Sequence, residues 1–175
     1  RLIIIAKNLA EKEGIAKITL NRPQVLNAIS PQLLLELEAA LKDIASDDTV
    51  GVVVLTGAGR AFSAGVDIKG MNEARPESSV ATRRRLALDV IEAIENLEKP
   101  VIAAVNGFCL TGALEVATAC DIIIASENAK FGDTHVNVGL VAGDGGAVIW
   151  PLLCGLARAK EYLMTGDLIS APEAE

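Results

Sequence analysis

The sequence is poor in histidine, cysteine and aromatic residues, and each shortage narrows the possible chemistry. The 175 residues contain one histidine and three cysteines, with no ligand pair at a spacing typical of zinc, so no metal site is expected. Cys109, Cys120 and Cys154 form no CxxC pair, which predicts reduced thiols. Aromatic residues make up 3% of the chain and hydrophobic residues 51%, so Ala, Val, Ile and Leu must form the core.

Positive charge and long hydrophobic runs are also scarce. The chain has 16 basic and 23 acidic residues, a net charge of -7, which argues against a general nucleic-acid or anionic-membrane surface. The apolar start Leu2 to Ala6 is too short for a signal sequence, and no run of 18 apolar residues occurs. We therefore expect a soluble, cytoplasmic protein without nucleic-acid or membrane partners.

Strand-like and helix-like segments alternate, which predicts an α/β fold. We expect a hairpin from Leu2–Lys7 and Gly14–Asn21, a helix from Ser30-Pro31 to about Ser46, and a central strand at Gly51–Thr56. A capping-box pattern at Ser170-Ala-Pro-Glu173 predicts another helix start. Residues 1–169 should form one core domain, and residues 170–175 should begin a helical C-terminal segment. Further expected elements are helices at Val80–Leu97, from Gly143–Gly146 and at Leu156–Met164, and strands at Val101–Val105, Ile122–Ala125 and Lys130–Gly132.

The segment Val101–Asp121 concentrates the candidate chemistry. A buried strand leads into a helix that starts near Thr111 and Gly112 and carries Glu115 three residues later. Unpaired N–H groups at such a start favour negative charge, and Glu115 shares a helix face with Gly112. An anion-stabilising donor beside a proton-handling acid indicates a catalytic site. The alternative is a glycine that permits close packing and a glutamate that favours the helix dipole.

The glycine-rich loop Gly57–Met71 is a second candidate, because small residues leave backbone amides accessible beyond a strand end. Right-handed crossovers would bring Ala64 of this loop to face Gly112. A dinucleotide fingerprint is disfavoured because Phe62 stands where its last glycine is required, and Ser63 does not lie in a nucleophile elbow.

His135 is the only imidazole, in the polar stretch Asp133-Thr134-His135, and Asp144 follows nine residues later. Taken singly, His135 could be structural and Asp144 could cap the next helix. Taken together, they could form a base and the carboxylate that fixes its tautomer.

These motifs, in this order, resemble the crotonase family, also called the enoyl-CoA hydratase/isomerase family. The resemblance implies a spiral of ββα units and an oxyanion hole from the Ala64 and Gly112 N–H groups, with Glu115 as a catalytic acid. It also implies an acyl-CoA thioester substrate, no cofactor beyond that coenzyme A, and a homotrimer or a dimer of trimers. The implied substrate-binding residues are Arg22, Val25, Leu26, Ala64, Gly65, Val66 and Asp67. The matching segments are Asn21-Arg22-Pro23, Asn27-Ala28, Leu55–Lys69, Lys99–Gly107, Gly112–Glu115, Cys120–Ala125 and Phe131-Gly132.

The sequence departs from the hydratase pattern at His135, which stands where hydratases of the family have a second glutamate. Glu115 and His135 could share the acid and base roles. The stretch from His135 to Trp150 resembles 6-oxocamphor hydrolase, a family member that cleaves a carbon–carbon bond without coenzyme A. A β-diketone hydrolase using His135 and Asp144, and a non-catalytic acyl-CoA binder, are therefore alternatives to a hydratase or isomerase.

Overall fold

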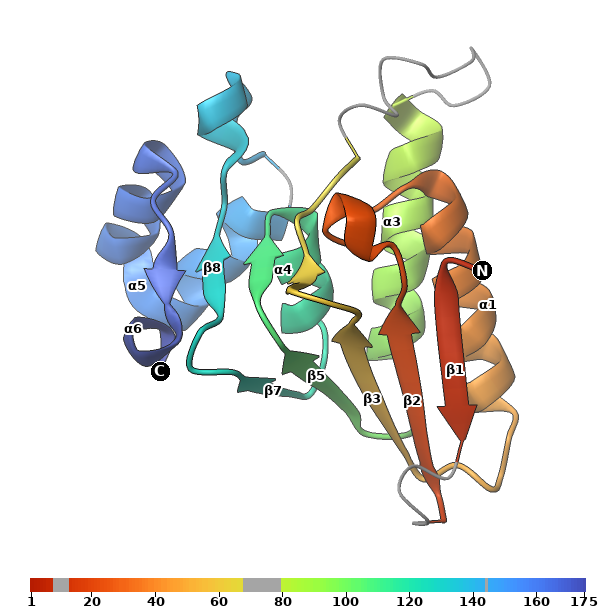
Figure 1. The fold of residues 1–175 in the computed structure, drawn as a ribbon. Helices are drawn as coiled ribbons and strands as arrows, with labels where there is room; N and C mark the ends of the chain where they lie inside the picture. The colour runs from red at the N-terminus through yellow and green to blue at the C-terminus, as the bar shows by residue number, and fades with distance from the viewer. Residues whose placement is uncertain (8–12, 68–79, 144) are drawn as a thin grey trace.

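The computed structural model describes residues 1–7, 13–67, 80–143 and 145–175. Within them the chain forms a five-stranded sheet of order β1-β2-β3-β5-β7 and a four-stranded sheet of order β4-β6-β8-β9 (Figure 1). The strands are β1 (Ile3–Lys7), β2 (Ile15–Leu20), β3 (Val52–Gly57), β4 (Ala61–Ser63), β5 (Val101–Val105), β6 (Phe108–Leu110), β7 (Ile122–Ala125), β8 (Lys130–Gly132) and β9 (Ile169–Ser170). The helices are α1 (Pro31–Ala45), α3 (Val80–Glu95), α4 (Gly112–Thr118), α5 (Gly145–Thr165) and α6 (Ala171–Ala174), with 3-10 helices η2 (Pro23–Val25) and η3 (His135–Val138).

A repeated unit of two strands and a helix generates both sheets. In the units β3-β4-α3, β5-β6-α4 and β7-β8-α5, the first strand joins the larger sheet and the second joins the smaller one. Strands β3, β5 and β7 pair in parallel, and so do β4, β6 and β8. The expected α/β spiral of ββα units is confirmed. Its consequence is that β4, β6 and β8 all end at the same edge of the smaller sheet.

The predicted N-terminal hairpin and the helix that follows it are both present in the structure. The local sequence signals for these elements are strong. Strand β1 pairs antiparallel with β2, with Ile5 opposite Ile18. Helix α1 begins after Ser30, whose hydroxyl accepts the Leu33 N–H at 3.3 Å, and Pro31 occupies its first turn. The face of α1 that packs into the core is an apolar stripe at helical spacing, formed by Leu33, Leu34, Leu37, Ala40, Leu41 and Ile44.

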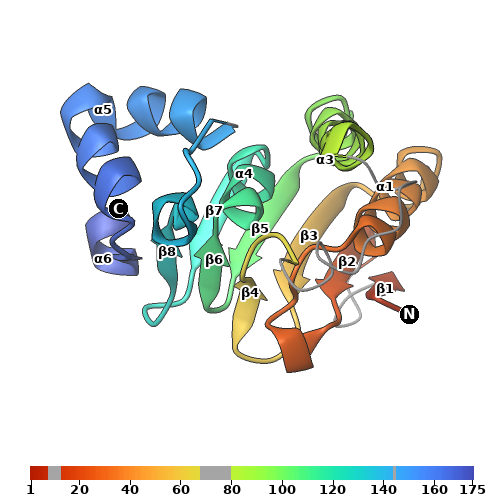
Figure 2. The ribbon, with the colours of Figure 1, turned by 90° about the horizontal axis from the view of Figure 1, so that it is seen from above.

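Helices α1, α3 and α4 lie in a row on one side of the strands, and α5 and α6 lie at the end of the molecule that holds the C-terminus (Figure 2). Helix α5 is interrupted at Gly155, whose φ of 79° and ψ of 160° are not helical, so the two helices expected here are present on either side of a kink. Ser170 lies at the N-cap of α6, but its side chain makes no capping hydrogen bond. The helix start is therefore confirmed, while the capping-box hydrogen bond of Ser170 is absent.

The three cysteines are free and differ in environment, which gives a direct chemical test. Cys109 and Cys120 are buried and Cys154 is exposed. Burial raises the pKa of the Cys109 thiol, and burial with the nearby Asp121 carboxylate raises the pKa of Cys120 to about 12. Because the thiolate is the reactive form, we expect a disulfide reagent to titrate one thiol in the native protein and three after denaturation. Three rapidly reacting native thiols would contradict this packing.

Candidate active site

The candidate site lies where β4, β6 and β8 end side by side. Ser63 of β4 is paired with Cys109 of β6, and Cys109 is paired with Phe131 of β8. The segment from Ala64 to Asp67 follows β4, Thr111 and Gly112 follow β6, and the segment from Asp133 to His135 follows β8. Ligands of parallel α/β sheets bind outside the carboxyl ends of strands, so this edge is the expected place for a site.

The loops after β4 and β6 are in direct contact. A Cβ atom at Gly65 would overlap the Thr111 Oγ1 atom and lie 2.8 Å from the Leu110 carbonyl oxygen. A Cβ atom at Gly112 would lie 3.7 Å from the Cγ2 atom of Val66. Two segments separated by more than forty residues therefore bring their backbones together beside Val66 and Gly112.

The backbone hydrogen bonds correct the predicted donor in the first loop. The Ala64 N–H donates to the Leu26 carbonyl at 2.9 Å, so it is already used within the protein. Ile29 pairs with Val66 as a parallel bridge, in which the Ile29 N–H donates to the Gly65 carbonyl and the Asp67 N–H to the Ile29 carbonyl. Along an extended segment, backbone N–H groups alternate in direction. The Val66 N–H thus points away from Ile29, and it has no acceptor within the described part of the chain.

Gly112 is the first residue of α4, a position whose N–H has no partner within the helix. The preceding Thr111 has φ 49° and ψ -123°, an unusual conformation for a residue with a side chain. Its N–H donates to the Gly132 carbonyl of β8 at 2.9 Å, which holds the turn against the neighbouring strand. A strained turn that is held in place immediately before a helix N-terminus is typical of functional backbone.

Glu115 lies in the first turn of α4, and its carboxylate is held by the next helix. The Glu115 Oε1 atom accepts the Gly146 N–H at 3.1 Å, in the first turn of α5. A Cβ atom at Gly145 would lie 2.9 Å from the Glu115 carboxyl carbon, so the absence of a side chain at Gly145 leaves room for this approach. The carboxylate is therefore fixed beside the junction of the two loops rather than extended into solvent.

His135 forms a pair with Asp133, which the sequence analysis did not assign. The imidazole Nδ1 atom lies 2.6 Å from the Asp133 Oδ1 atom, and the same oxygen accepts the His135 backbone N–H at 3.1 Å. The Asp133 side chain is 2% exposed and that of His135 is 14% exposed. The predicted partner, Asp144, lies outside the described residues, so its pairing with His135 stays a prediction. The Asp-x-His spacing was the available signal, since Asp side chains often bond to groups two residues later.

The predicted substrate-binding residues Arg22 and Asp67 are paired with each other. The Arg22 Nη2 atom lies 3.0 Å from the Asp67 Oδ2 atom, and both side chains are largely buried. This ion pair ties the segment containing Val25 and Leu26 to the loop after β4. Val25 is 40% exposed, whereas the Leu26 carbonyl holds Ala64. A role of these residues in binding a ligand stays a prediction.

Three polar residues are buried within the described residues, and all three hold the loops of the site: Asn27, Ser63 and Asp133. Asn27 donates to the Ala58 and Ala61 carbonyls at 2.9 and 2.8 Å. The Ser63 hydroxyl accepts the Gly65 N–H at 3.2 Å. Buried polar side chains with satisfied hydrogen bonds specify one backbone arrangement, so these three residues restrict the conformation of the loops around the site.

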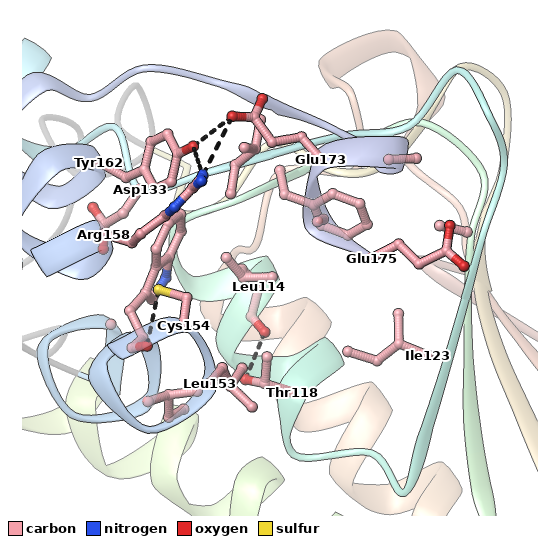
Figure 3. Close-up of a pocket in the computed structure, with 18 of the residues that line it drawn as sticks. Leu114, Thr118, Ile123, Asp133, Leu153, Cys154, Arg158, Tyr162, Glu173 and Glu175 are labelled. Atoms are coloured by element: carbon pink, nitrogen blue, oxygen red, sulfur yellow. Dashed lines mark hydrogen bonds and ion pairs between the residues drawn. The ribbon is translucent and has the colours of Figure 1, made fainter. Parts of the chain in front are cut away.

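A cavity of about 610 Å³ adjoins these loops and is walled by α4, α5, α6, β7 and β8. Glu115, Thr111 and Asp133 line it, whereas His135 is not among the lining residues. Figure 3 shows Leu114 and Thr118 on one side and the linked side chains of Arg158, Tyr162 and Glu173 on another. The Tyr162 hydroxyl donates to the Glu173 carboxylate at 2.6 Å, which raises the pKa of that phenol. The mostly apolar wall suits a ligand with an aliphatic portion.

In the part of the chain that the structure describes, no cluster of three or more His, Cys, Asp or Glu side chains could hold a metal ion. None of the helices described there has both the length and the apolar character needed to cross a bilayer.

The geometry defines a class of site: backbone segments from two separate loops lie together beside a helix N-terminus that carries a carboxylate in its first turn. Backbone N–H groups in such an arrangement can stabilise negative charge on a carbonyl oxygen. The chain belongs to the enoyl-CoA hydratase/isomerase family, whose model matches residues 10–175. It is 44% identical over 168 residues to a probable enoyl-CoA hydratase of Rhizobium meliloti, covering 95% of this chain and 64% of the relative. It is also 44% identical over 170 residues to a short-chain-enoyl-CoA hydratase of Clostridium acetobutylicum, again covering 95% and 64%.

Solved structures agree with this membership. An enoyl-CoA hydratase from Bacillus anthracis superimposes with a TM-score of 0.87 at 38% identity, covering 99% of this chain and 66% of the other. A monofunctional enoyl-CoA isomerase from Mycobacterium smegmatis superimposes with a TM-score of 0.81 at 36% identity, covering 100% and 73%. The chain thus spans slightly less than two thirds of the curated relatives named above.

Proposed function

We propose that the protein is an acyl-CoA enzyme of the hydratase/isomerase type. The observation that carries this proposal is the meeting of the Val66 and Gly112 backbones beside Glu115 at the shared edge of β4 and β6. Relatives at 44% identity are named as enoyl-CoA hydratases, which supports an α,β-unsaturated acyl-CoA as substrate. We place the thioester oxygen between the N–H groups of Val66 and Gly112.

The chemistry follows from the position of these donors. When hydroxide from water adds to the β-carbon, the electron pair of the double bond moves toward the thioester and its oxygen becomes enolate-like. Two N–H groups aimed at that oxygen stabilise the charge, each worth about 3 kcal/mol in comparable sites. Protonation of the α-carbon completes the 3-hydroxyacyl-CoA. In an isomerase, the same donors would stabilise the enolate left after proton removal.

Glu115 and His135 supply the acid and base in this proposal. Glu115 is held in the first turn of α4, next to the donors, and hydratases of the family use a glutamate there. Hydration needs one group to take a proton from water and another to protonate carbon, and an imidazole can replace a carboxylate in either role. The proposal includes no cofactor beyond the coenzyme A of the substrate. A homotrimer or dimer of trimers in the cytoplasm is the expected assembly.

The test is hydration of crotonyl-CoA and of longer 2-enoyl-CoA thioesters by the purified protein. The reaction is measured as the decrease in absorbance of the conjugated thioester. We expect saturable turnover that yields 3-hydroxyacyl-CoA. A migration of the double bond without addition of water would assign an isomerase. Tight binding of the thioesters with no reaction across the series would instead support the non-catalytic binder and overturn the enzymatic proposal.

One observation favours a second candidate. The pair formed by Asp133 and His135 is the arrangement of a base and its orienting carboxylate, which a hydrolase of β-diketones also requires. In that reaction a water adds to one carbonyl, the carbon–carbon bond to the central carbon breaks, and an acid and an enolate form. A cyclic β-diketone would be converted to a ring-opened keto acid, and loss of this product in His135→Ala would support the candidate.

A further inference from the structure

We infer that Asp133 is a positioning residue that sets which ring nitrogen of His135 handles the proton in the proposed reaction. The inference rests on the proposed function for the role of His135, but not for the pairing itself. Asp133 follows β8 directly, and its side chain is almost fully buried. A buried carboxylate requires hydrogen-bond donors, and His135 supplies two of them.

The geometry at Asp133 fixes the ring in two ways. One oxygen, Oδ1, accepts both the backbone N–H of His135 and a bond from Nδ1, at 3.1 and 2.6 Å. A carboxylate accepts but does not donate, so Asp133 favours the tautomer of neutral His135 that carries the ring proton on Nδ1. In that tautomer the lone pair is on Nε2, which is the form that a general base requires.

The position of Asp133 connects this pair to the rest of the site. Asp133 lines the same cavity as Glu115 and Thr111, and the Gly132 carbonyl that precedes it at the end of β8 accepts the Thr111 N–H. A shift of Asp133 would therefore displace both the His135 ring and the turn at Thr111 that precedes Gly112. In hydration, the proton of the attacking water would pass to Nε2 while the C–O bond forms at the β-carbon.

The single histidine of the chain makes the tautomer directly measurable. The experiment is ¹⁵N NMR of histidine-labelled protein at about pH 8.5, where an ordinary imidazole is neutral. We expect a protonated-type Nδ1 resonance and an unprotonated-type Nε2 resonance. A protonated-type Nε2 in the wild-type protein overturns the inference without any variant.

Two variants separate positioning from simple packing. In Asp133→Ala the acceptor is lost, and we expect the Nε2–H tautomer to become populated and kcat to fall about 10²-fold or more with a small change in KM. In Asp133→Asn the amide oxygen still accepts both bonds, so we expect the Nδ1–H tautomer to persist and a smaller loss of kcat. Asp48→Asn, at an exposed carboxylate between the end of α1 and the start of β3, should change neither the spectrum nor the rate.

The spectrum requires no substrate, so it separates failure of this inference from failure of the proposed function. An Nδ1–H tautomer in a protein that hydrates no enoyl-CoA would overturn the function and support the pairing. Hydration with an unchanged tautomer in folded Asp133→Ala would overturn the inference and keep the function. If Asp133→Ala does not fold, the inference is tested by the wild-type spectrum and the Asp133→Asn variant. An Nδ1–H tautomer that persists in Asp133→Asn supports it, and an Nε2–H tautomer in the wild-type protein overturns it.

Discussion

Replacing Glu115 by glutamine is expected to lower kcat for enoyl-CoA hydration by about 10²- to 10⁴-fold, the usual contribution of a positioned acid or base. Glutamine keeps an oxygen that can accept the Gly146 N–H, so the first turn of α5 should keep its place. The substitution removes the ability to exchange a proton but adds no atoms. We therefore expect a normal unfolding transition and a nearly unchanged KM, measured with a saturable enoyl-CoA substrate.

Glu127→Gln is the matched control for Glu115→Gln. Glu127 lines the same cavity but lies in the turn between β7 and β8, away from the meeting point of the two loops. The control removes the same charge from the same cavity and should change kcat less than about threefold. Equal losses in the two variants would mean that the net charge of the cavity, rather than proton transfer by Glu115, sustains the reaction.

Gly65→Ala is expected to have the largest effect on stability, about 2–5 kcal/mol, together with loss of activity. Gly65 has a φ of 84°, and a Cβ atom there would overlap Thr111 Oγ1 and approach the Leu110 carbonyl. Conformational strain and steric overlap therefore act together at the junction of the two loops. Urea unfolding gives the change in free energy, and residual folded protein gives the activity.

Gly139→Ala separates the two causes. Gly139 has a similar φ of 75°, but a Cβ atom there would meet nothing within 4 Å. Only the strain remains, so we expect a loss of about 1–2 kcal/mol. If both variants lower the free energy of unfolding by the same amount, steric overlap with Thr111 contributes nothing at Gly65. The close contact between the loops after β4 and β6 would then be wrong.

The larger elements were predictable because each carries a strong local signal. Ser30-Pro31 caps α1, and apolar runs mark β3 and β5. The smaller sheet was largely missed, because β4 and β6 have three residues each and are too short to show alternation. The sequence pattern places β4 within the loop Gly57–Met71 and predicts no strand at Phe108–Leu110, although these are the strands that align the site.

Some site residues could likewise be predicted from the sequence, and others could not. Gly112 and Glu115 follow from a strand-to-helix pattern, since both lie within one turn. The choice between Ala64 and Val66 could not be made from sequence, because it depends on which N–H faces Leu26 and which points away from Ile29. That alternation is set by pairing between segments distant in the chain.

The most direct measurement is a crystal structure of the protein with acetoacetyl-CoA, whose enolate resembles the proposed intermediate. We predict that the thioester oxygen lies 2.7–3.1 Å from both the Val66 and Gly112 nitrogen atoms, as an oxyanion site requires, with the Glu115 carboxylate beside the α-carbon. A thioester oxygen that contacts neither nitrogen, or that binds elsewhere in the cavity, would contradict the central claim.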